Sequence, residues 1–587
     1  MLDVPLDLQH ANTYTDNNSN AFTVADNYNR FNISGDITRY ANWHGQHAFK
    51  GGFQYERLGN DVNQGDQAPN VVLSWNQNYT SLSGQTIRGT YGYYRVRQTY
   101  TVGNIKSNNM GLYLQDQWSF NDKLTINYGA RFDNTKFPSY RAENPGIEFG
   151  FGSKVAPRLG FAYDVKGDGK WKTYGSWGVF YDIEKLELPR GAWGADHWIE
   201  YYWTLDNYNY PAIDCDGTPN SGCPGKYIEQ IDFRHVSNDP SNNLVDPNLK
   251  PFKAQEFVMG LDHELNRLMS IGGRYVHKWV NNAIEDVGVQ DVQLGAEIFY
   301  IANPGYGLGA YPLTTAFPRT PFPVRNYDAA EISFNKRMAN NWSLTANATF
   351  SRLWGNYSGL SNSTSESNRN SPNVTRLWDG LYMSFTEKGC PDHVNCDDGV
   401  SNGLISTSRP VTLKLQGTYM LPWGTAAGVT FQAFNGNLQT SSITYKGVPV
   451  QALGPGDLGR TDFYTNMDLN FSQTFRFKKG TSFTLQFQVL NVFDQDFVTG
   501  VATGITRSGT ANALFLPNDS GTLAAGSFFN GFDTKQAVLD RYNCTGFYAN
   551  PSTGCVPKAN SIPNQLYGMD SAYRSPRTAR FYIRFAF

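Results

Sequence analysis

Long hydrophobic runs are missing from this sequence of 587 residues. No stretch approaches the roughly 18 consecutive apolar residues of a transmembrane helix, which excludes helical membrane spans. No long stretch shows the 3.6-residue period of an amphipathic helix, so we expect little helix. Mean hydropathy is only −0.48. This low value still allows a membrane barrel, because only every second residue of a barrel strand faces lipid.

Charge is also scarce in this chain. Asp, Glu, Lys and Arg make up 17% of the residues, and the formal net charge is −2. This composition gives no electrostatic footprint for nucleic acid, so we expect no nucleic-acid partner. Residues 1–7 contain neither a basic segment nor an apolar core, so they do not form a signal peptide. If the protein is exported, we expect an upstream part to be missing from this sequence.

Catalytic signatures are absent as well. The sequence has no nucleophile elbow, no phosphate-binding loop and no dinucleotide fingerprint. His44 and His47 flank an expected tight turn, where a solvated turn is favoured over a metal site. We expect no catalytic residue, no cofactor and no metal site, which favours transport or binding over enzyme chemistry.

The chain is rich in aromatic residues and in period-two alternation. Aromatic residues reach 15%, which suits the aromatic girdles of a membrane barrel. Apolar and polar residues alternate most clearly over 124–133, 342–351 and 483–489. The polar side of each segment is neutral or mixed in charge, which favours a water-filled lumen. Arg131, Asp133, Glu331, Arg337, Lys414 and Asp468 are candidates to line a substrate path, or form part of a general polar lining.

The spacing of the expected turns is more informative than the strands. Very short turns join strands in pairs, near 42–44, 121–122, 166–169, 266, 339–340, 422–423 and 478–480. Long links separate the pairs, at about 58–105, 135–154, 184–252, 280–325, 355–407, 437–462 and 494–575. Compact soluble domains rarely contain so many long structureless loops, whereas membrane barrels have short periplasmic turns and long outer loops. Counting a further strand near Leu2–Gln9 and the last strand, we expect about sixteen strands.

The last strand has an apolar side that continues to the end of the chain, made by Phe581, Ile583, Phe585 and Phe587. An exposed apolar edge on a soluble sheet invites aggregation, whereas lipid solvates it. Taken alone, this segment also fits an ordinary amphipathic strand of a soluble β-domain.

The six cysteines form three local pairs, each inside one long link: Cys215 with Cys223, Cys390 with Cys396, and Cys544 with Cys555. Local pairs in an oxidising compartment indicate disulfides that fix loop tips. A metal site is the weaker alternative, because the spacings are not C-x-x-C and no His/Cys cluster accompanies them.

Several segments resemble, in their order along the chain, the barrel of TonB-dependent transporters. They are MGLYLQDQW at 110–118, LTINYGARFD at 124–133, APRLGFAY at 156–163, LNVFD at 490–494 and the terminal segment 575–587. The Oar-like branch is the closer resemblance, through DPNLKP at 246–251, FNKR at 334–337 and the segment 409–424. The resemblance spans nearly the whole chain.

The resemblance implies an all-β fold: a large antiparallel transmembrane β-barrel of 22 strands with a plugged lumen, in the cell outer membrane of a Gram-negative bacterium. About sixteen strands against 22 then imply that residues 1–587 form a single barrel domain, truncated at its N-terminal side. The signal peptide, the plug and the TonB box would lie outside this sequence.

The implied function is a receptor and transporter that moves an unknown ligand, a metal chelate, a carbohydrate or a peptide or protein, across the outer membrane. The implied partners are outer-membrane lipid, the TonB complex through the absent plug, and the barrel-assembly machinery through the C-terminal strand. The aromatic residues Trp193, Trp198, Tyr201, Tyr202 and Trp203 would form a capture surface, with girdle or loop packing as alternatives. A passive porin-like channel and a surface anchor or adhesion barrel remain the competing hypotheses.

Overall fold

The computed structural model consists of strands and connecting segments, with one named helical element, η3 (Gly307–Gly309), in the residues that it describes. No helix among these residues is long and apolar enough to cross a membrane. The structure describes residues 14–15, 21–66, 68–81, 83–140, 146–182, 186, 190, 196–209, 213–232, 245–291, 296–310, 322–359, 402–445, 448–450, 455–477, 480–505, 564 and 566–587.

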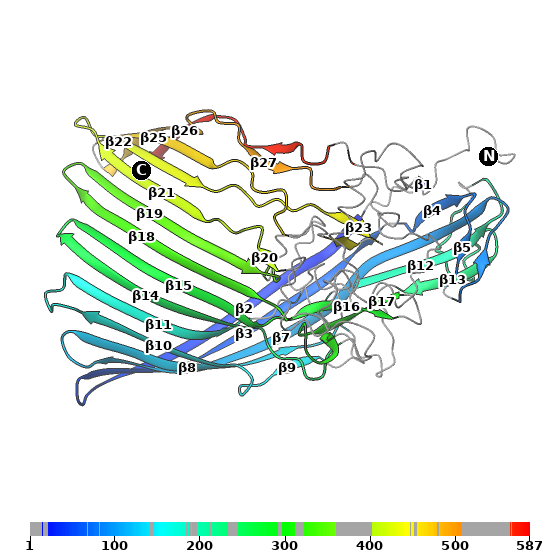
Figure 1. Ribbon diagram of the computed structural model, residues 1–587, viewed down its shortest axis with the longest axis horizontal. Helices are drawn as coiled ribbons and strands as arrows, with labels where there is room; N and C mark the ends of the chain where they lie inside the picture. Colours follow the sequence, from blue (N-terminus) through cyan, green and yellow to red (C-terminus); the bar gives the residue numbers. More distant parts are fainter. Residues whose placement is uncertain are drawn as a thin grey trace, which may run out of the picture.

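One antiparallel sheet of 21 strands dominates the fold (Figure 1). Fifteen of these strands pair one after another in chain order. They are β2 (Ala21–Asn42), β3 (Gln46–Asp66), β7 (Gly92–Ser119), β8 (Leu124–Phe137), β10 (Val155–Asp164), β11 (Trp171–Tyr181), β14 (Lys253–Asn266), β15 (Met269–Asn282), β18 (Arg325–Ala339), β19 (Trp342–Gly355), β21 (Val411–Met420), β22 (Thr425–Phe434), β25 (Tyr464–Arg476), β26 (Ser482–Leu490) and β29 (Thr578–Ala586).

Seven short turns join these strands in pairs at one end of the sheet, on the left of Figure 1. Six of the turns fall where the sequence predicts them. Residues 478 and 479 of the seventh, predicted at 478–480, lie outside the described residues, but β25 and β26 flank it as predicted. The predicted alternation of short turns and long links is confirmed. The β2–β3 turn has His44 and Gly45 at φ angles of 48° and 121°, and the β18–β19 turn has Asn340 and Asn341 at 54° and 68°. In the two-residue β18–β19 turn, positive φ at both central positions is the geometry of a tight hairpin. We call this end the turn end and the opposite end the loop end.

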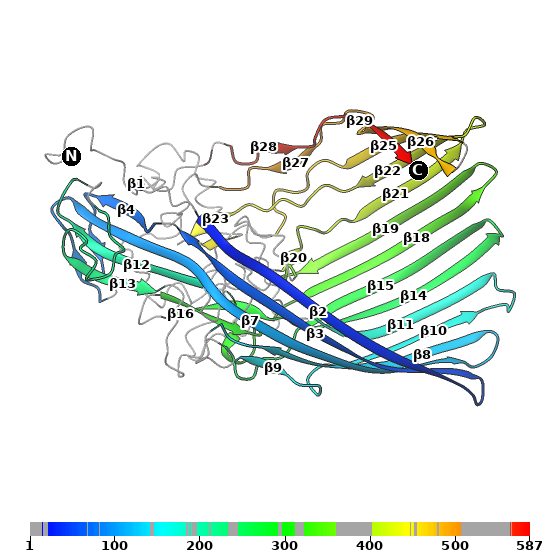
Figure 2. The ribbon, with the colours of Figure 1, turned by 180° about the vertical axis from the view of Figure 1, so that it is seen from behind.

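The fifteen successively paired strands correspond to the seven pairs and the last strand expected from the sequence, although the structure has more strands in total than the sixteen expected. Every one of the paired strands and the last strand, β29, is present. The additional strand expected near Leu2–Gln9 lies outside the described residues. Within them, β2 pairs only with β3 and β29 only with β26, so these two strands form the edges of the sheet (Figure 2).

Apolar side chains gather on one face of the sheet and form rows across neighbouring strands. One such row joins Phe471, Phe487 and Phe581 in β25, β26 and β29. Phe581, Ile583 and Phe585 are 55% to 62% exposed on this face. A continuous exposed apolar band is unfavourable in water and favourable in lipid.

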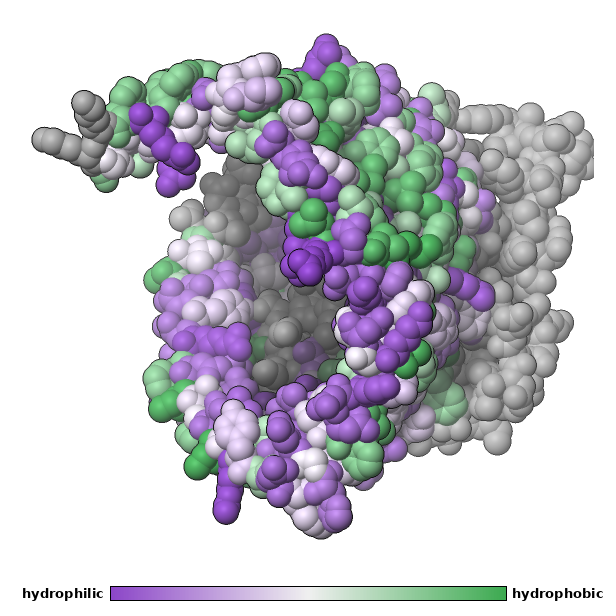
Figure 3. All heavy atoms as spheres, turned by 90° about the vertical axis from the view of Figure 1, so that its left-hand side faces the viewer, coloured by the Kyte–Doolittle hydropathy of each residue, from purple (hydrophilic) through white to green (hydrophobic). Residues whose placement is uncertain are grey.

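The other face of the sheet is polar and lines a lumen. Figure 3, viewed from the turn end, shows the hollow that the curved sheet surrounds, with hydrophilic residues along its rim. Strand alternation therefore separates a lipid face from a water face over the same backbone.

The long links are not structureless, which corrects the sequence-based expectation. Strands β3 and β7 run far into the link expected at 58–105, and six short strands extend the main sheet: β1 (Tyr14–Thr15), β4 (Asn70–Trp75), β9 (Ile147–Phe149), β12 (Asp196–Leu205), β13 (Tyr227–Asp232) and β20 (Gly403–Leu404). Four small hairpins are formed by β5 (Tyr79–Thr80) with β6 (Thr86–Ile87), β16 (Glu285–Asp291) with β17 (Ala296–Ala302), β23 (Ile443–Tyr445) with β24 (Val448–Val450), and β27 (Val498–Val501) with β28 (Asp570–Tyr573). Turn-rich composition hides these strands in the sequence.

Replacing Gly45 by Ala tests the β2–β3 turn. At a φ of 121° a side chain is strained, and its Cβ would lie 2.5 Å from the carbonyl oxygen of Ser119. We expect Gly45→Ala to lower the free energy of unfolding by about 2 kcal/mol. Gly169→Ala is the matched control, because Gly169 also has positive φ, at 72°, but has no atom within 4 Å of the new Cβ.

The control should cost about 1 kcal/mol. Urea unfolding in lipid vesicles, followed by the heat-dependent mobility of the folded barrel on gels, measures both variants. Equal unfolding midpoints for the two variants would contradict the predicted clash at the turn.

Candidate functional site

Ten charged side chains on the lumen face form five ion pairs. The pairs are Lys50–Asp36 (2.9 Å), Arg131–Asp133 (2.8 Å), Lys172–Asp262 (3.0 Å), Arg274–Glu331 (2.6 Å) and Lys278–Glu256 (2.5 Å). Three candidates from the sequence, Arg131, Asp133 and Glu331, thus have an opposite charge beside them. Such solvated pairs add little stability, but they leave most of this wall without net charge.

The remaining candidates for the lumen face are spread around the sheet. Lys414 lies opposite Asn347 and Gln432 in the β-ladder. Asp468 accepts hydrogen bonds from the Asn491 backbone N–H (2.9 Å) and the Asn466 amide (3.1 Å). The backbone N–H of Arg337 donates to the Leu268 carbonyl oxygen (2.9 Å) near the turn end. The structure therefore does not bring these three residues together with Arg131.

A hollow of about 630 Å³ lies in the wall formed by β3, β7, β8, β10 and β11. Glycines make the hollow possible, because they leave the backbone uncovered where side chains would fill the space. At Gly129, an added Cβ would lie 2.6 Å from the Leu114 carbonyl oxygen and 2.7 Å from Cβ of Gln115. Gly160 and Gly178 line the same hollow on the two following strands. This volume is in the usual range for small-molecule pockets.

At the loop end, connecting segments pack a small hydrophobic cluster against the sheet. It joins Ile105 of β7 and Phe149 of β9 with Leu186 from the β11–β14 link and with Ile284 and Ile301 from the β15–β18 link. All of these side chains are buried. Links that are far apart in the sequence are therefore held together beside β3 and β7.

Asp246 stabilises the links beside this cluster. It is the first residue of the segment DPNLKP, on which the Oar-like resemblance is based. Its carboxylate accepts hydrogen bonds from the backbone N–H groups of Asn248 and Leu308, both at 2.8 Å. Its own backbone N–H donates to the carbonyl oxygen of Ile301 (2.9 Å). Asp246 is only 4% exposed, so the motif has a structural role in joining two links.

Beyond the lumen, β4, β12, β13 and the first half of β7 form an outer part of the sheet, on the right of Figure 1. One face of this outer sheet has a core like that of a soluble protein. Its buried members are Val71, Leu73, Trp75, Tyr94, Val96, Tyr201, Trp203, Leu205, Ile213 and Cys223. The outer sheet thus has its own apolar stabilisation and does not depend on lipid.

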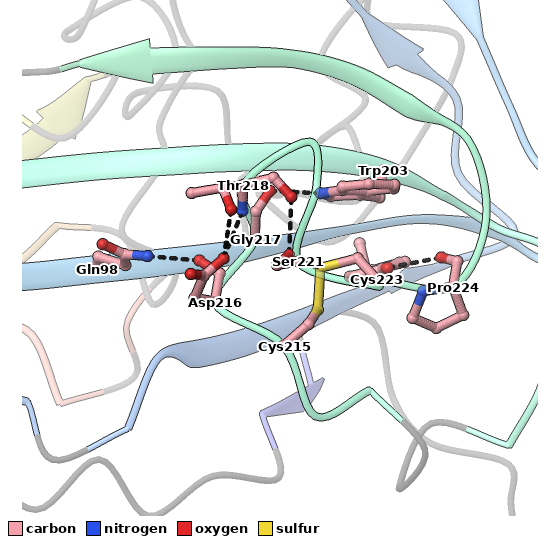
Figure 4. The surroundings of a disulfide bond; sticks show 10 residues. Gln98, Trp203, Cys215, Asp216, Gly217, Thr218, Ser221, Cys223 and Pro224 are labelled. Atoms are coloured by element: carbon pink, nitrogen blue, oxygen red, sulfur yellow. Dashed lines mark hydrogen bonds between the residues drawn. A yellow bond between two sulfur atoms is a disulfide. The ribbon is translucent and has the colours of Figure 1, made fainter.

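A disulfide between Cys215 and Cys223 closes the β12–β13 link over this core (Figure 4). Their Cα atoms are 5.4 Å apart. The indole N–H of Trp203 donates to the Gly217 carbonyl oxygen (2.8 Å), and the Gln98 amide donates to that of Asp216 (2.5 Å). Hydrogen bonds from the Thr218 hydroxyl and backbone N–H lower the pKa of the Asp216 carboxyl.

The other two cysteine pairs that the sequence suggests lie outside the described residues. They are Cys390 with Cys396, and Cys544 with Cys555. For Cys390, Cys396, Cys544 and Cys555 the disulfides therefore stay predictions from the spacing in the sequence.

The aromatic residues that the sequence suggested as a capture surface are mostly buried. Tyr201, Tyr202 and Trp203 are 7%, 8% and 4% exposed. For these three residues the prediction of a capture surface was wrong, and the alternative of loop packing is correct. Trp198 is half-buried and donates to Glu200 (3.2 Å), and Trp193 lies outside the described residues.

The opposite face of the outer sheet has a buried carboxylate, Glu200, which is 0% exposed. It is paired with the Arg95 guanidinium and accepts a hydrogen bond from the Tyr202 hydroxyl (2.7 Å). Burial, with the nearby Glu200 charge, raises the pKa of the Tyr202 phenol. Tyr79 stacks on Tyr202 with ring centroids 4.4 Å apart. The Glu200 carboxylate is thus bound by Arg95 and Tyr202, and its role is structural, within the packing of this sheet.

The sequence favoured a solvated turn for both His44 and His47. His44 lies in such a turn, but His47 lies in β3. His47 is 6% exposed, and its Nδ1 lies 2.7 Å from the Asp116 carboxylate. That carboxylate also accepts from the Tyr128 hydroxyl (2.9 Å). The sequence could not reveal this pair, because its members are 69 residues apart. No group of three or more His, Cys, Asp or Glu that could hold a metal ion occurs in the described part of the chain.

These features define a class: an all-β protein with an apolar lipid face, a polar lumen, short turns at one end and long links at the other. The family model described as "TonB dependent receptor-like, beta-barrel" matches residues 2–492. The chain belongs to this family of transporters, which act in the outer membrane of Gram-negative bacteria and are not enzymes. The turn end is accordingly periplasmic and the loop end extracellular.

A curated relative, the TonB-dependent transporter Oar of Myxococcus xanthus, is 26% identical over 586 residues. The match covers 95% of this chain and 51% of the relative. The chain therefore spans about half the length of the curated relative that it matches.

Two solved structures resemble the chain more distantly. The outer membrane transporter YddB of Escherichia coli has a TM-score of 0.47 and 12% identity, over 81% of this chain and 52% of its own. The ferric-catecholate import receptor Fiu of Escherichia coli has a TM-score of 0.40 and 13% identity, over 81% and 52%.

Replacing both Cys215 and Cys223 by Ser tests the disulfide of the outer sheet. Opening a loop of this length should destabilise it by roughly 2–3 kcal/mol. We expect residues 206–226 to be cleaved faster by external protease, while the membrane strands stay intact. Asn220→Ser, an exposed change in the same loop, is the control and should be cleaved as slowly as the unchanged protein. Equal cleavage rates for all three proteins would refute the stabilising role.

Proposed function

We propose that residues 1–587 act as the barrel domain of an outer-membrane receptor that carries a ligand through its lumen. The observation that carries this proposal is the polar wall with its small-molecule hollow, set in a sheet whose other face is apolar. Membership of the TonB-dependent receptor family supports the same function.

The ligand class that we propose is the one stated from the resemblance: a metal chelate, a carbohydrate, or a peptide or protein. Energy coupling to the TonB complex would act through a plug domain, to which we assign none of these residues. Outer-membrane lipid is the proposed partner of the apolar face. The proposed contact for the barrel-assembly machinery is the C-terminal strand, with Phe581, Ile583, Phe585 and Phe587.

We propose disulfides for all three cysteine pairs, each of which would fix a connection at the loop end. The environment of Cys215 and Cys223 supports this for the first pair, because that link covers an apolar core. The pairs Cys390 with Cys396 and Cys544 with Cys555 are supported by their spacing in the sequence.

Deletion of the gene in the native host tests the transport function. Radiolabelled ferric chelates, oligosaccharides and peptides are supplied one at a time, and initial uptake rates are measured. We expect uptake of one class to fall to background, and a protonophore to reproduce the loss in the parent strain, because TonB-coupled transport uses the energy of the inner membrane.

Uptake that depends on the gene but resists the protonophore would contradict energised transport and favour a passive channel. Unchanged uptake of every class, together with lost surface adhesion, would favour a surface anchor. A control strain that carries the gene on a plasmid should regain the parental uptake rate.

A further inference from the structure

Arg158 differs from the other charged residues of the lumen wall in its neighbours. It stands in a row of residues that face each other across six strands: Lys50, Gln115, Gly129, Arg158, Gly178 and Glu256. Both of its direct neighbours in this row are glycines. Strands lie about 4.8 Å apart, so the next side chains in the row are roughly 10 Å away on either side. The Arg158 side chain is exposed, and it lines the hollow described above.

The charge of Arg158 is uncompensated in the described part of the protein. The other charged groups that line the lumen side of the hollow each have a partner, since Lys50 pairs with Asp36, Arg131 with Asp133 and Glu256 with Lys278. Arg158 has no carboxylate partner among the described residues. The hollow therefore has one positive charge without a carboxylate partner. The Asp116 carboxylate also lines the hollow, but it is only 3% exposed and is hydrogen-bonded to His47 and Tyr128.

The Arg158 guanidinium is supported by an aromatic ring. Its central carbon lies 4.8 Å from the centroid of the Phe180 ring. An aromatic platform of this kind attracts the cation and limits its motion. The donors at the edge of the guanidinium plane remain free, in the fork geometry that matches carboxylate and phosphate oxygens.

Neutral polar groups complete the lining of the hollow. Gln115 of β7, Asn127 of β8 and Ser176 of β11 line it, and so do Tyr113 and Tyr174. These side chains supply hydrogen-bond donors without adding charge. The volume of about 630 Å³ fits a small molecule.

We propose that Arg158 and this hollow form a subsite for the carboxylate or phosphate group of a small anionic solute that crosses the lumen. The proposal rests on the transport function proposed above, and it names the class of substrate. The Arg158 guanidinium binds the anion through charge-assisted hydrogen bonds. The neighbouring Gly129 and Gly178 leave room for the rest of the solute. Because the site is open to water, salt should weaken the binding.

Calorimetric titration of the full-length protein in detergent tests this subsite, with citrate and inorganic phosphate as separate probes. We expect the unchanged protein to bind at least one of them, and Arg158→Gln to weaken that binding about tenfold or more, because a hydrogen bond to a charged group is lost. Arg274→Gln is the matched control. It removes another exposed lumen arginine, which is paired with Glu331, and it should leave the affinity unchanged.

Phe180→Leu is a second variant, which keeps the arginine and removes its platform; we expect an intermediate loss of affinity. Preference for citrate or for phosphate would identify the carboxylate or the phosphate group as the ligand. Binding of neither probe by the unchanged protein would overturn the proposal, as would equal affinities of the unchanged protein and Arg158→Gln. Either result would leave the uptake measurements in the host untouched, so a failure here is distinguishable from a failure of the transport function.

Discussion

Backbone hydrogen bonding in lipid is the constraint on which the rest of this structure depends. A peptide group without a partner inside the membrane costs several kcal/mol, so each spanning strand must pair on both sides over its full length. The fifteen successive antiparallel strands meet this demand through most of the sheet. Pairing then assigns alternate residues to opposite faces. The apolar row at Phe487 and the polar row at Arg158 follow from the same ladder.

Residues at the loop end lie outside the lipid and have other structural roles. The long strands β3 and β7 continue past the membrane and support an outer sheet with a water-excluding core of its own. Asp246 and the Cys215–Cys223 disulfide hold the links that meet there. A ligand would therefore meet an entrance stabilised by these contacts, and then a polar wall on which five ion pairs lie.

Local patterns predicted the periodic part of the fold well and the non-local part poorly. The tight turn at Asn340 and the alternation over 342–351 can be predicted from the sequence, because turn geometry and the strand period depend on neighbouring residues only. The burial of Tyr201 and Trp203 depends on β4 and β7, more than a hundred residues away in the chain. The same limit hid the His47–Asp116 pair and the position of Arg158 between two glycines. Local sequence also gave no sign of the aromatic platform under Arg158.

The most direct test of this account measures which face of one strand touches lipid. Nitroxide labels on single introduced cysteines at successive positions 344–350 of β19 report their environment in membranes, through collisions with oxygen or a water-soluble nickel complex. We expect lipid-type accessibility at Leu344, Ala346, Ala348 and Phe350, and water-type accessibility at Thr345, Asn347 and Thr349. Accessibility without this alternation would contradict the assignment of a lipid face and a lumen face.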